Sequence, residues 1–532
     1  MLQLGLAGCG TKAANTSSTT QTPTVLVSVF PLSPTIFINA TVQLTATVTG
    51  SSNTSVTWSI QEGASGGSIT PNGLFTAPAA PGTYHVIATS VADTAESAST
   101  SIVVHTIVIN PQTAYVRIGQ GFTFGVAPNV QVAWSVQEGS SGGSIAPSGD
   151  YTAPSTAGTY HIVAATIIGN ATADATVSVN QQSGFSLFGN MAVARAAHTA
   201  TLLPNHMVLM VDGGYFDIDD TLTPISSAEI FDPSTGKFFA AGATSTGREF
   251  HTATLLPNGK VLITGGGDKL NSAELYDPAT NSFSQTGSMS ISRIGHTATL
   301  LNDGTVLIVG GSSDSRAEIF NPATGRFSST GSLATARNSH TATRLPDGRV
   351  LIVGGRADYL QPILSMNALS SSEIYDPRLG AFTSAGTMAF ARTGHTATLL
   401  NNGTVLIAGG ANSGVLASTE IYDPAAGQFL AGPSMNMPRT SHAAAILPNG
   451  EVVLAGGIPL VPQVYVGYAP TPTSEVYDPL KNSFTFTASM SDGRFWHTAT
   501  ALGDGRILIV GGGHSNAPQF GVDSVPTAEV LY

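Results

Sequence analysis

A short pattern that recurs seven times in the last two-thirds of the chain limits the possible folds more than any other feature. One copy contains, in order, Arg248, His251, the run 252–256 (TATLL), the turn Asn258-Gly259, the run 261–263 (VLI), Gly265-Gly266, Glu274, Tyr276-Asp277-Pro278 and Phe283. The glycine pair recurs at Gly213-Gly214, Gly310-Gly311, Gly354-Gly355, Gly409-Gly410, Gly456-Gly457 and Gly511-Gly512. Four short apolar runs separated by turn residues predict a four-stranded antiparallel sheet in each copy. Such sheets bury both faces only when neighbours stack, so the repeat predicts a seven-bladed β-propeller over residues 181–532.

The two ends of this region predict how the ring closes. The seventh copy stops at Tyr532, after its third strand. Residues 185–195 (FSLFGNMAVAR) align without a gap to 283–293 (FSQTGSMSISR), the fourth strand of another copy and the residues after it. We therefore expect the N-terminal strand to complete the last blade and remove the open sheet edges.

A second repeat precedes the propeller and is nearly literal. Residues 56–90 return as residues 132–166, each with one tryptophan, Trp58 or Trp134, in a short strand. This pattern predicts two small β-sandwiches, at 24–104 and 105–180, and resembles the bacterial immunoglobulin-like domains of surface proteins. His85 and His161, which follow equivalent tyrosines, are expected to be partly buried strand residues rather than metal ligands.

Composition agrees with an all-β fold and narrows the partners. Charged residues make up only 10% of the chain, and glycine is abundant with 59 residues, as expected for many short strands and tight turns. The formal net charge is −12, so no basic field is present to bind nucleic acid.

The seven-copy pattern resembles the kelch repeat, and kelch propellers with attached immunoglobulin-like domains resemble galactose oxidase and its relatives. That resemblance implies a copper site that depends on a cysteine cross-linked to a tyrosine. The only cysteine of this chain is Cys9, far from the propeller. The expected cofactor and metal content is therefore none, and we identify no catalytic residues.

The segment around Cys9 predicts export. Leu6-Ala7-Gly8-Cys9 resembles the lipobox of bacterial lipoproteins, in which the cysteine is lipidated. Only eight residues precede it, too few for a signal peptide, so a longer precursor is expected. Residues 1–23 then form a signal remnant and a Ser/Thr-rich tether. We expect an exported monomer of the bacterial cell envelope, lipid-anchored or extracellular, that contacts the membrane through the lipid alone.

An Arg-x-x-His motif and one glutamate recur in every blade. The pairs are Arg195/His198, Arg248/His251, Arg293/His296, Arg337/His340, Arg392/His395, Arg439/His442 and Arg494/His497. The glutamates are Glu229, Glu274, Glu318, Glu373, Glu420, Glu475 and Glu529. Because the set is identical in every blade, we expect it to stabilise the blades through charge-assisted hydrogen bonds and not to bind a metal.

Loop lengths differ between blades and indicate where a ligand would bind. The loop between the second and third strands is long in blades one, four, six and seven, where 14 to 17 residues separate the glycine pair from the glutamate. These loops lie on the same face as the connections between blades. Their aromatic and polar residues are the predicted ligand site: Tyr215, Phe216, Asp217, Asp219, Asp220, Arg356, Asp358, Tyr359, Tyr465, Tyr468, His514 and Phe520. Aromatic rings beside carboxylates suit a carbohydrate or a peptide, although long loops also pack on one another.

Three classes of function remain open from the sequence. The first, which the missing catalytic constellation favours, is a surface-displayed binding, adhesion or scaffold protein. The second is a carbohydrate-active enzyme of the kelch propeller class without the copper and Tyr-Cys cofactor, since paired acids from distant loops cannot be recognised in a sequence. The third is a purely structural envelope protein. Fold alone does not decide between them.

Overall fold

The computed structural model describes residues 24–167, 171–180, 184–217, 221–267, 270–357, 367–459, 469–516 and 521–532. Its described part is all-β, apart from two single 3₁₀ turns, η1 (Gly63–Gly66) and η2 (Gly139–Gly142). Within these ranges no helix is long and apolar enough to cross a membrane.

The two N-terminal copies have the same set of strands and the same sheet orders. The first contains β1 (Leu26–Phe30), β2 (Thr35–Phe37), β3 (Thr41–Gln43), β4 (Thr45–Thr49), β5 (Val56–Ile60), β6 (Ser68–Ile69), β7 (Leu74–Thr76), β8 (Gly82–Ser90) and β9 (Ser97–His105). The second contains β10 (Val108–Asn110), β11 (Thr113–Arg117), β12 (Gly121–Thr123), β13 (Gly125–Ala127), β14 (Val132–Val136), β15 (Ser144–Ile145), β16 (Asp150–Thr152), β17 (Gly158–Thr166) and β18 (Thr172–Asn180). The orders β2-β9-β8-β5 and β11-β18-β17-β14 correspond strand for strand, as do β3-β7-β6 and β12-β16-β15.

Most of the remaining described strands form seven four-stranded antiparallel sheets, numbered here 1 to 7. Sheets 1 and 2 are β20 (Thr199–Leu202), β21 (Val208–Val211), β24 (Ala228–Asp232), β25 (Lys237–Ala240), and β26 (Thr252–Leu255), β27 (Val261–Thr264), β28 (Ala273–Asp277), β29 (Ser282–Gln285). Sheets 3 and 4 are β30 (Thr297–Leu300), β31 (Val306–Val309), β32 (Arg316–Asn321), β33 (Arg326–Ser332), and β34 (Thr341–Arg344), β35 (Val350–Val353), β36 (Ser371–Asp376), β37 (Ala381–Thr387). Sheets 5 and 6 are β38 (Thr396–Leu399), β39 (Val405–Ala408), β40 (Thr419–Asp423), β41 (Gln428–Ala431), and β42 (Ala443–Ile446), β43 (Val452–Ala455), β44 (Ser474–Asp478), β45 (Ser483–Phe486). Sheet 7 is β46 (Thr498–Ala501), β47 (Ile507–Val510), β50 (Thr527–Leu531) and β19 (Phe185–Asn190).

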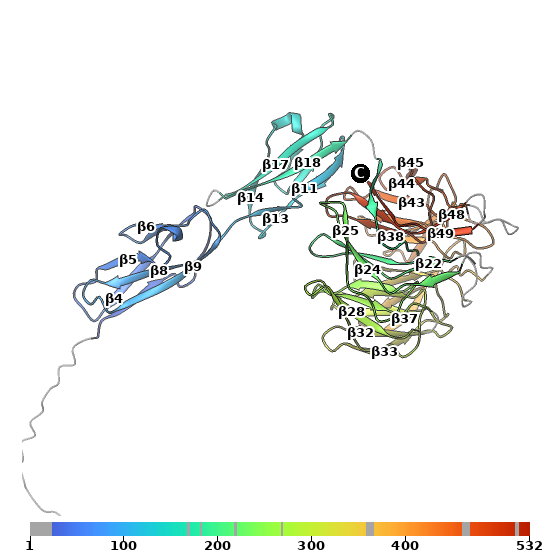
Figure 1. The fold of residues 1–532 in the computed structure, drawn as a ribbon, viewed down its shortest axis with the longest axis horizontal. Coiled ribbons are helices and arrows are strands. Elements are labelled where there is room, and N and C mark those ends of the chain that lie inside the picture. Colours follow the sequence, from blue (N-terminus) through green and yellow to red (C-terminus); the bar gives the residue numbers. More distant parts are fainter. Residues whose placement is uncertain are drawn as a thin grey trace, which may run out of the picture. The chain divides into compact units, whose positions relative to one another are not determined.

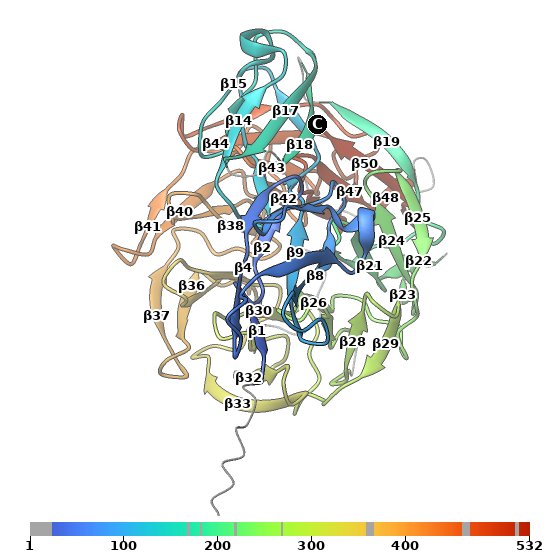
Figure 2. The same cartoon turned by 90° about the vertical axis from the view of Figure 1, so that its left-hand side faces the viewer.

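The first strands of these sheets neighbour one another in cyclic order. β20 contacts β26, each later first strand contacts the next, and β46 of sheet 7 contacts β20 again. β19 pairs antiparallel with β50, as the alignment of residues 185–195 predicted. Figure 2 shows the fourth strands β25, β29, β33, β37 and β41 at the rim and the first strands nearer the centre. The arrangement is propeller-like.

The second strand of every sheet is buried, and it is apolar except for Thr264 at the end of β27, because its two faces pack against the two neighbouring sheets. Leu209, Val211, Val261 and Ile263 belong to one such cluster, between sheets 1 and 2. Equivalent clusters lie between the other neighbouring sheets, including sheets 7 and 1. Near-continuous Val, Leu and Ile runs are what a strand buried on both faces requires.

Two hairpins extend the loops between second and third strands. They are β22 (Gly214–Phe216) with β23 (Leu222–Pro224) in sheet 1, and β48 (Gly513–Asn516) with β49 (Gly521–Ser524) in sheet 7. β22 contacts β49. These two long loops therefore pack on one another, the alternative that the sequence left open beside ligand binding.

The chain divides into two compact units. One comprises the residues up to 109 together with 125–134 and 163–174, and the other comprises 110–124, 135–162 and 175–532. In Figure 1 the colour of the chain runs from blue, around β4 and β5, to red, around β48 and β49. The seven sheets and the candidate site lie wholly in the second unit.

Candidate functional site

Every sheet contains one buried Arg–Glu pair, which fixes the loop that enters its first strand. The closest Nη–Oε distances of these pairs are 2.6 to 3.0 Å, and the arginine side chains have no exposed surface. The same guanidinium also donates to the carbonyl that ends the second strand, as Arg293 does to Gly310 at 2.7 Å. The structural role predicted for the Arg and Glu of the motif is thus confirmed.

The seven motif histidines are buried and neutral. Desolvation, followed by the charge of the neighbouring arginine, lowers the pKa of His251, His296, His395 and His497 to about 3. In six sheets the Nε2 atom lies 2.9 to 3.2 Å from a threonine Oγ1 at the start of the preceding sheet's first strand. These hydrogen bonds connect adjacent sheets, which explains why the histidine recurs.

The seventh junction lacks this bond. Sheet 6 begins with Ala443 where the other six begin with threonine, and among the described residues neither ring nitrogen of His497 has a hydrogen-bond partner. The Ala455 carbonyl is close enough to favour a proton on the ring but does not reach hydrogen-bonding geometry.

Ala443→Thr is therefore expected to raise the free energy of unfolding by about 0.5–1.5 kcal/mol, since it supplies the missing hydroxyl. Thr396→Ala, the mirror change at an intact junction, is expected to lower it by about 1–3 kcal/mol. Urea denaturation of both variants measures the two effects. Destabilisation by Ala443→Thr would contradict the role given to these hydroxyl groups.

The residue just before each histidine forms a second ring, with a left-handed backbone. Its φ lies between +50° and +64° in all seven sheets: Ala197, Phe250, Gly295, Ser339, Gly394, Ser441 and Trp496. Backbone hydrogen bonds of 2.9 to 3.2 Å link six of the seven neighbouring pairs, including Ala197 N–H to the Trp496 carbonyl between sheets 1 and 7.

This ring surrounds a cavity of about 610 Å³ at the centre of the seven sheets, since residues from all of them line it. The volume is within the usual range for small-ligand sites. One side of the cavity is aromatic, with Phe250 and Trp496. The other side is polar, and its residues are Asn338, Ser339, Thr393, Thr440 and Ser441. Apart from the neutral histidines, Arg356 is the ionisable residue among the described residues that line it.

The two aromatic residues of the cavity wall have a backbone conformation that bulky side chains disfavour. A bulky side chain at positive φ is rare and costs about 1 kcal/mol or more, whereas the glycines at two equivalent positions avoid that cost. Phe250 and Trp496 both have a φ of +52°. Their rings meet edge to face with centroids 4.9 Å apart, and Phe216 stacks on Trp496 at 6.2 Å. Strain kept at a cavity wall is typical of a functional site.

The predicted site residues divide into three groups. Arg356 lines the cavity and its Nε donates to Asn338 Oδ1 at 2.9 Å, and Phe216 supports the aromatic side. Tyr215 and His514 lie on hairpin strands β22 and β48, and Asp217 accepts a hydrogen bond from the Thr221 amide within its own hairpin. Asp219, Asp220, Asp358, Tyr359, Tyr465, Tyr468 and Phe520 lie outside the described residues, as does Cys9.

Sequence reasoning missed the positions that line most of the cavity. They are the two middle residues of Arg-x-x-His, which differ from blade to blade inside an otherwise constant motif. That variation, and a tryptophan at one of these positions in a chain with only three, was the available signal.

The histidines of the N-terminal copies are half-buried strand residues, as predicted. His85 Nδ1 lies 2.7 Å from Glu62 Oε1, and His161 Nδ1 lies 2.6 Å from Glu138 Oε1. These pairs join β8 and β17 to the turns that precede η1 and η2, and they explain why both residues recur.

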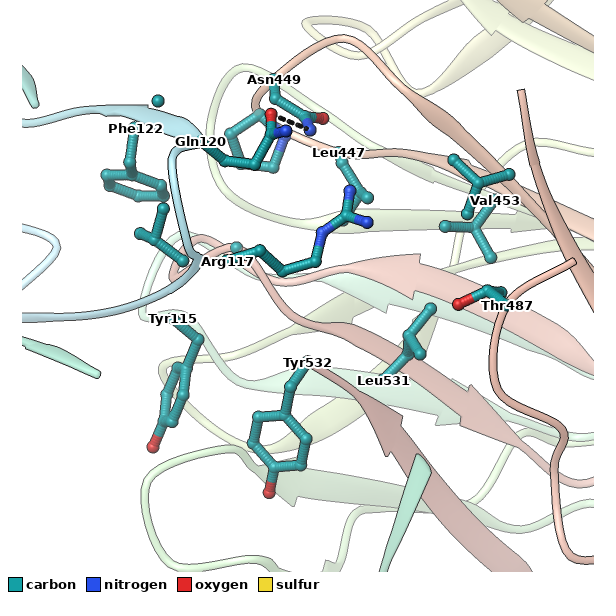
Figure 3. Close-up of a pocket in the computed structure, with 15 residues that line it drawn as sticks. Tyr115, Arg117, Gln120, Phe122, Leu447, Asn449, Val453, Thr487, Leu531 and Tyr532 are labelled. Carbon is teal, nitrogen blue, oxygen red and sulfur yellow. Dashed lines mark hydrogen bonds between the residues drawn. The ribbon is translucent and has the colours of Figure 1, made fainter. Parts of the chain in front are cut away.

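A second cavity lies within the same compact unit, between β11–β12 and the last sheets (Figure 3). Its volume is about 40 Å³, little more than one water molecule needs, so it is a packing contact and not a ligand site. The Arg506 guanidinium lies 4.4 Å from the Tyr115 ring centre, and Gln120 Oε1 accepts from Asn449 Nδ2 at 3.1 Å. Arg117 pairs with Glu451.

The cavity residues do not fit a copper ion of the kind that the kelch resemblance implies. The propeller has no cysteine, and the histidine Nε2 atoms of six sheets are engaged by threonine hydroxyls. Among the described residues, no three His, Cys, Asp or Glu side chains are grouped to hold a metal.

Comparisons with known proteins agree at the level of the fold. No protein-family model matches the chain, and no curated protein matches it. Among solved structures, a fungal alcohol oxidase of the AA5 family, determined in complex with copper, is similar with a TM-score of 0.52 and 17% sequence identity. The match covers 65% of this chain and 75% of that one. The likeness supports an all-β, propeller-like fold.

Proposed function

We propose that the chain is an exported binding protein, in which two immunoglobulin-like domains carry a closed seven-bladed kelch propeller whose central cavity binds a neutral carbohydrate. The observation that carries the proposal is the cavity, whose wall combines strained Phe250 and Trp496 with the polar side chains of Asn338, Thr440 and Ser441. Sugar rings present an apolar face and a hydroxylated edge, and such walls complement both. The lining histidines are neutral, so Arg356 is the charged residue among the described residues of the wall.

Support for the location comes from the two sets of loops that line the cavity, those between blades and those after the second strands. The first set of loops contributes the middle residues of Arg-x-x-His, and the second contributes Arg356 and, behind Trp496, Phe216. A site built from loops on a rigid framework can vary without cost to the sheets.

A glycan and peptide array probed with the purified protein, followed by a product assay on each bound compound, tests this function. The proposal predicts that neutral glycans bind and are recovered unchanged. Exclusive peptide binding would contradict the ligand class, and conversion of a bound glycan would favour a carbohydrate-active enzyme without copper. No binding to any compound on the array would favour a purely structural role.

The location also remains a proposal. Cys9 is expected to be lipidated and to anchor the protein outside the cytoplasm. Metabolic labelling with a palmitate analogue is expected to mark the wild type, expressed from a complete signal sequence, and not Cys9→Ser. Persistent labelling of that variant would contradict the anchor.

A further inference from the structure

Sheet 1 has a buried carboxyl group where the other sheets have glycine. The carbonyl that accepts from the motif arginine belongs to glycine in sheets 2 to 7, for example Gly265, but to Asp212 in sheet 1. The equivalent of the glycine pair is therefore Asp212-Gly213, one residue before the pair assigned from the sequence. Asp212 has a φ of +50° and no exposed surface.

Sheet 1 differs from the other sheets at a second position, next to Asp212. In sheet 2, a Cβ on Gly265 would lie 3.2 Å from the Met289 side chain, and sheets 4, 5 and 6 have the same glycine–methionine contact. Aligned on the motif arginine, sheet 1 has Thr244 in the place of that methionine. Thr244 Oγ1 lies 2.8 and 2.9 Å from the two oxygens of Asp212. A polar pair thus replaces an apolar contact at one junction.

The hydrogen bonds around Asp212 suit a carboxylic acid better than a carboxylate. Thr244 Oγ1 also lies 3.2 Å from the Thr246 carbonyl, yet it has a single proton. A protonated Asp212 donates to Thr244, which then donates to Thr246, so that only the uncharged carbonyl oxygen of Asp212 lacks a donor among the described residues. An ionised Asp212 takes that proton for one oxygen and leaves its other oxygen without a donor, which is costly in a buried site.

The pKa of Asp212 agrees with a protonated side chain. Burial is the main cause that raises the pKa of Asp212 to about 7. The Thr244 hydrogen bond and the charges of Arg248 and Arg195 lower this pKa, and the charge of Glu274 raises it. Both arginines are already paired, with Glu274 and Glu229. Because the folded-state pKa lies above the usual 3.8, protonation stabilises the fold, and this contribution is lost as the pH rises through about 7.

Asp212 lies at the start of the loop that supports the aromatic side of the cavity. Its amide donates to the Ser227 carbonyl at 3.0 Å, and Gly213 N–H donates to the Arg248 carbonyl at 2.8 Å. Strand β22 follows at once and ends with Phe216, which stacks on Trp496 with the ring planes 12° apart. A displacement at Asp212 is therefore transmitted along four residues to the wall.

We propose that Asp212 is a proton-dependent latch: its protonated form holds the loop that supports Phe216 and Trp496, and its ionisation loosens that wall and weakens ligand binding. The part concerning the ligand rests on the proposed function of the cavity. The part concerning the wall does not.

Trp496 fluorescence between pH 5 and 9, taken as the difference between each protein and its Trp496→Phe counterpart, tests the latch without a ligand. The full-length wild type is expected to show a transition with a midpoint near pH 7. Asp212→Asn, which keeps a donor to Thr244 but cannot ionise, is expected to show none. The double variant Asp212→Gly/Thr244→Met restores the glycine–methionine contact of sheets 2, 4, 5 and 6. It is also expected to show no transition, and it replaces Asp212→Asn in the test if that variant folds poorly. Asp314→Asn, in the corresponding loop of sheet 3, is the matched control and should titrate like the wild type.

A transition that persists in Asp212→Asn or in the double variant, or its absence in the wild type, would overturn the proposal. With a glycan from the array, affinity is expected to fall at least threefold from pH 6 to pH 8 in the wild type and to stay constant in Asp212→Asn. If no glycan binds, the proposed function fails while the fluorescence transition still decides on the latch.

Discussion

Arg439→Met is expected to lower the free energy of unfolding by about 3–5 kcal/mol, the cost of leaving a buried charge without its partner. Arg439 and Glu475 are both fully buried, with Nη2 2.9 Å from Oε1. The guanidinium also donates to the carbonyls of Gly456 and Thr473 at 2.7 and 3.0 Å. Methionine fills much of the same volume but supplies none of these hydrogen bonds.

The loss of stability should depend on the several N–H donors of the guanidinium group as well as on its charge. Arg439→Lys keeps the charge but cannot reach three acceptors at once, so an intermediate loss is expected. Arg349→Met is the matched control, because Arg349 forms an exposed pair with Asp347 at 2.7 Å, and its loss should cost less than about 1 kcal/mol. Urea denaturation compares the three variants. An Arg439→Met effect no larger than that of Arg349→Met would contradict the structural role of the motif.

The repeat made much of the fold predictable from the sequence. Seven copies in phase specified the sheets, and the alignment of residues 185–195 specified the strand that pairs with β50. The Arg–Glu pairs were predictable because both residues recur in every copy, and a feature that recurs seven times has to satisfy the same local geometry seven times.

The central cavity was harder to predict, because its walls come from the positions that do not repeat. Phe250, Asn338 and Trp496 are far apart in the sequence and meet only when the ring closes. Asp212 was missed for a related reason: an adjacent Gly213-Gly214 mimics the repeated glycine pair and shifts the register by one. The packing of Tyr115 on Arg506 has no periodic signal.

Trp496→Ala is expected to weaken binding of a glycan selected on the array by about 1–3 kcal/mol, or about 5- to 150-fold, if the sugar contacts this side of the cavity. The fold should tolerate the change, since Ala197 takes the equivalent left-handed position in sheet 1. Trp496→Phe should keep most of the affinity because Phe250 shows that a phenyl ring is accepted there.

Titration calorimetry of that glycan against the wild type, Trp496→Ala and Asp303→Ala tests the central claim most directly. Asp303 lies in the turn between β30 and β31, at the end of the sheets opposite the cavity loops. Binding in the central cavity predicts that Trp496→Ala loses affinity and that Asp303→Ala binds like the wild type. Unchanged affinity in Trp496→Ala together with lost affinity in Asp303→Ala would place the ligand on the other face and contradict the account.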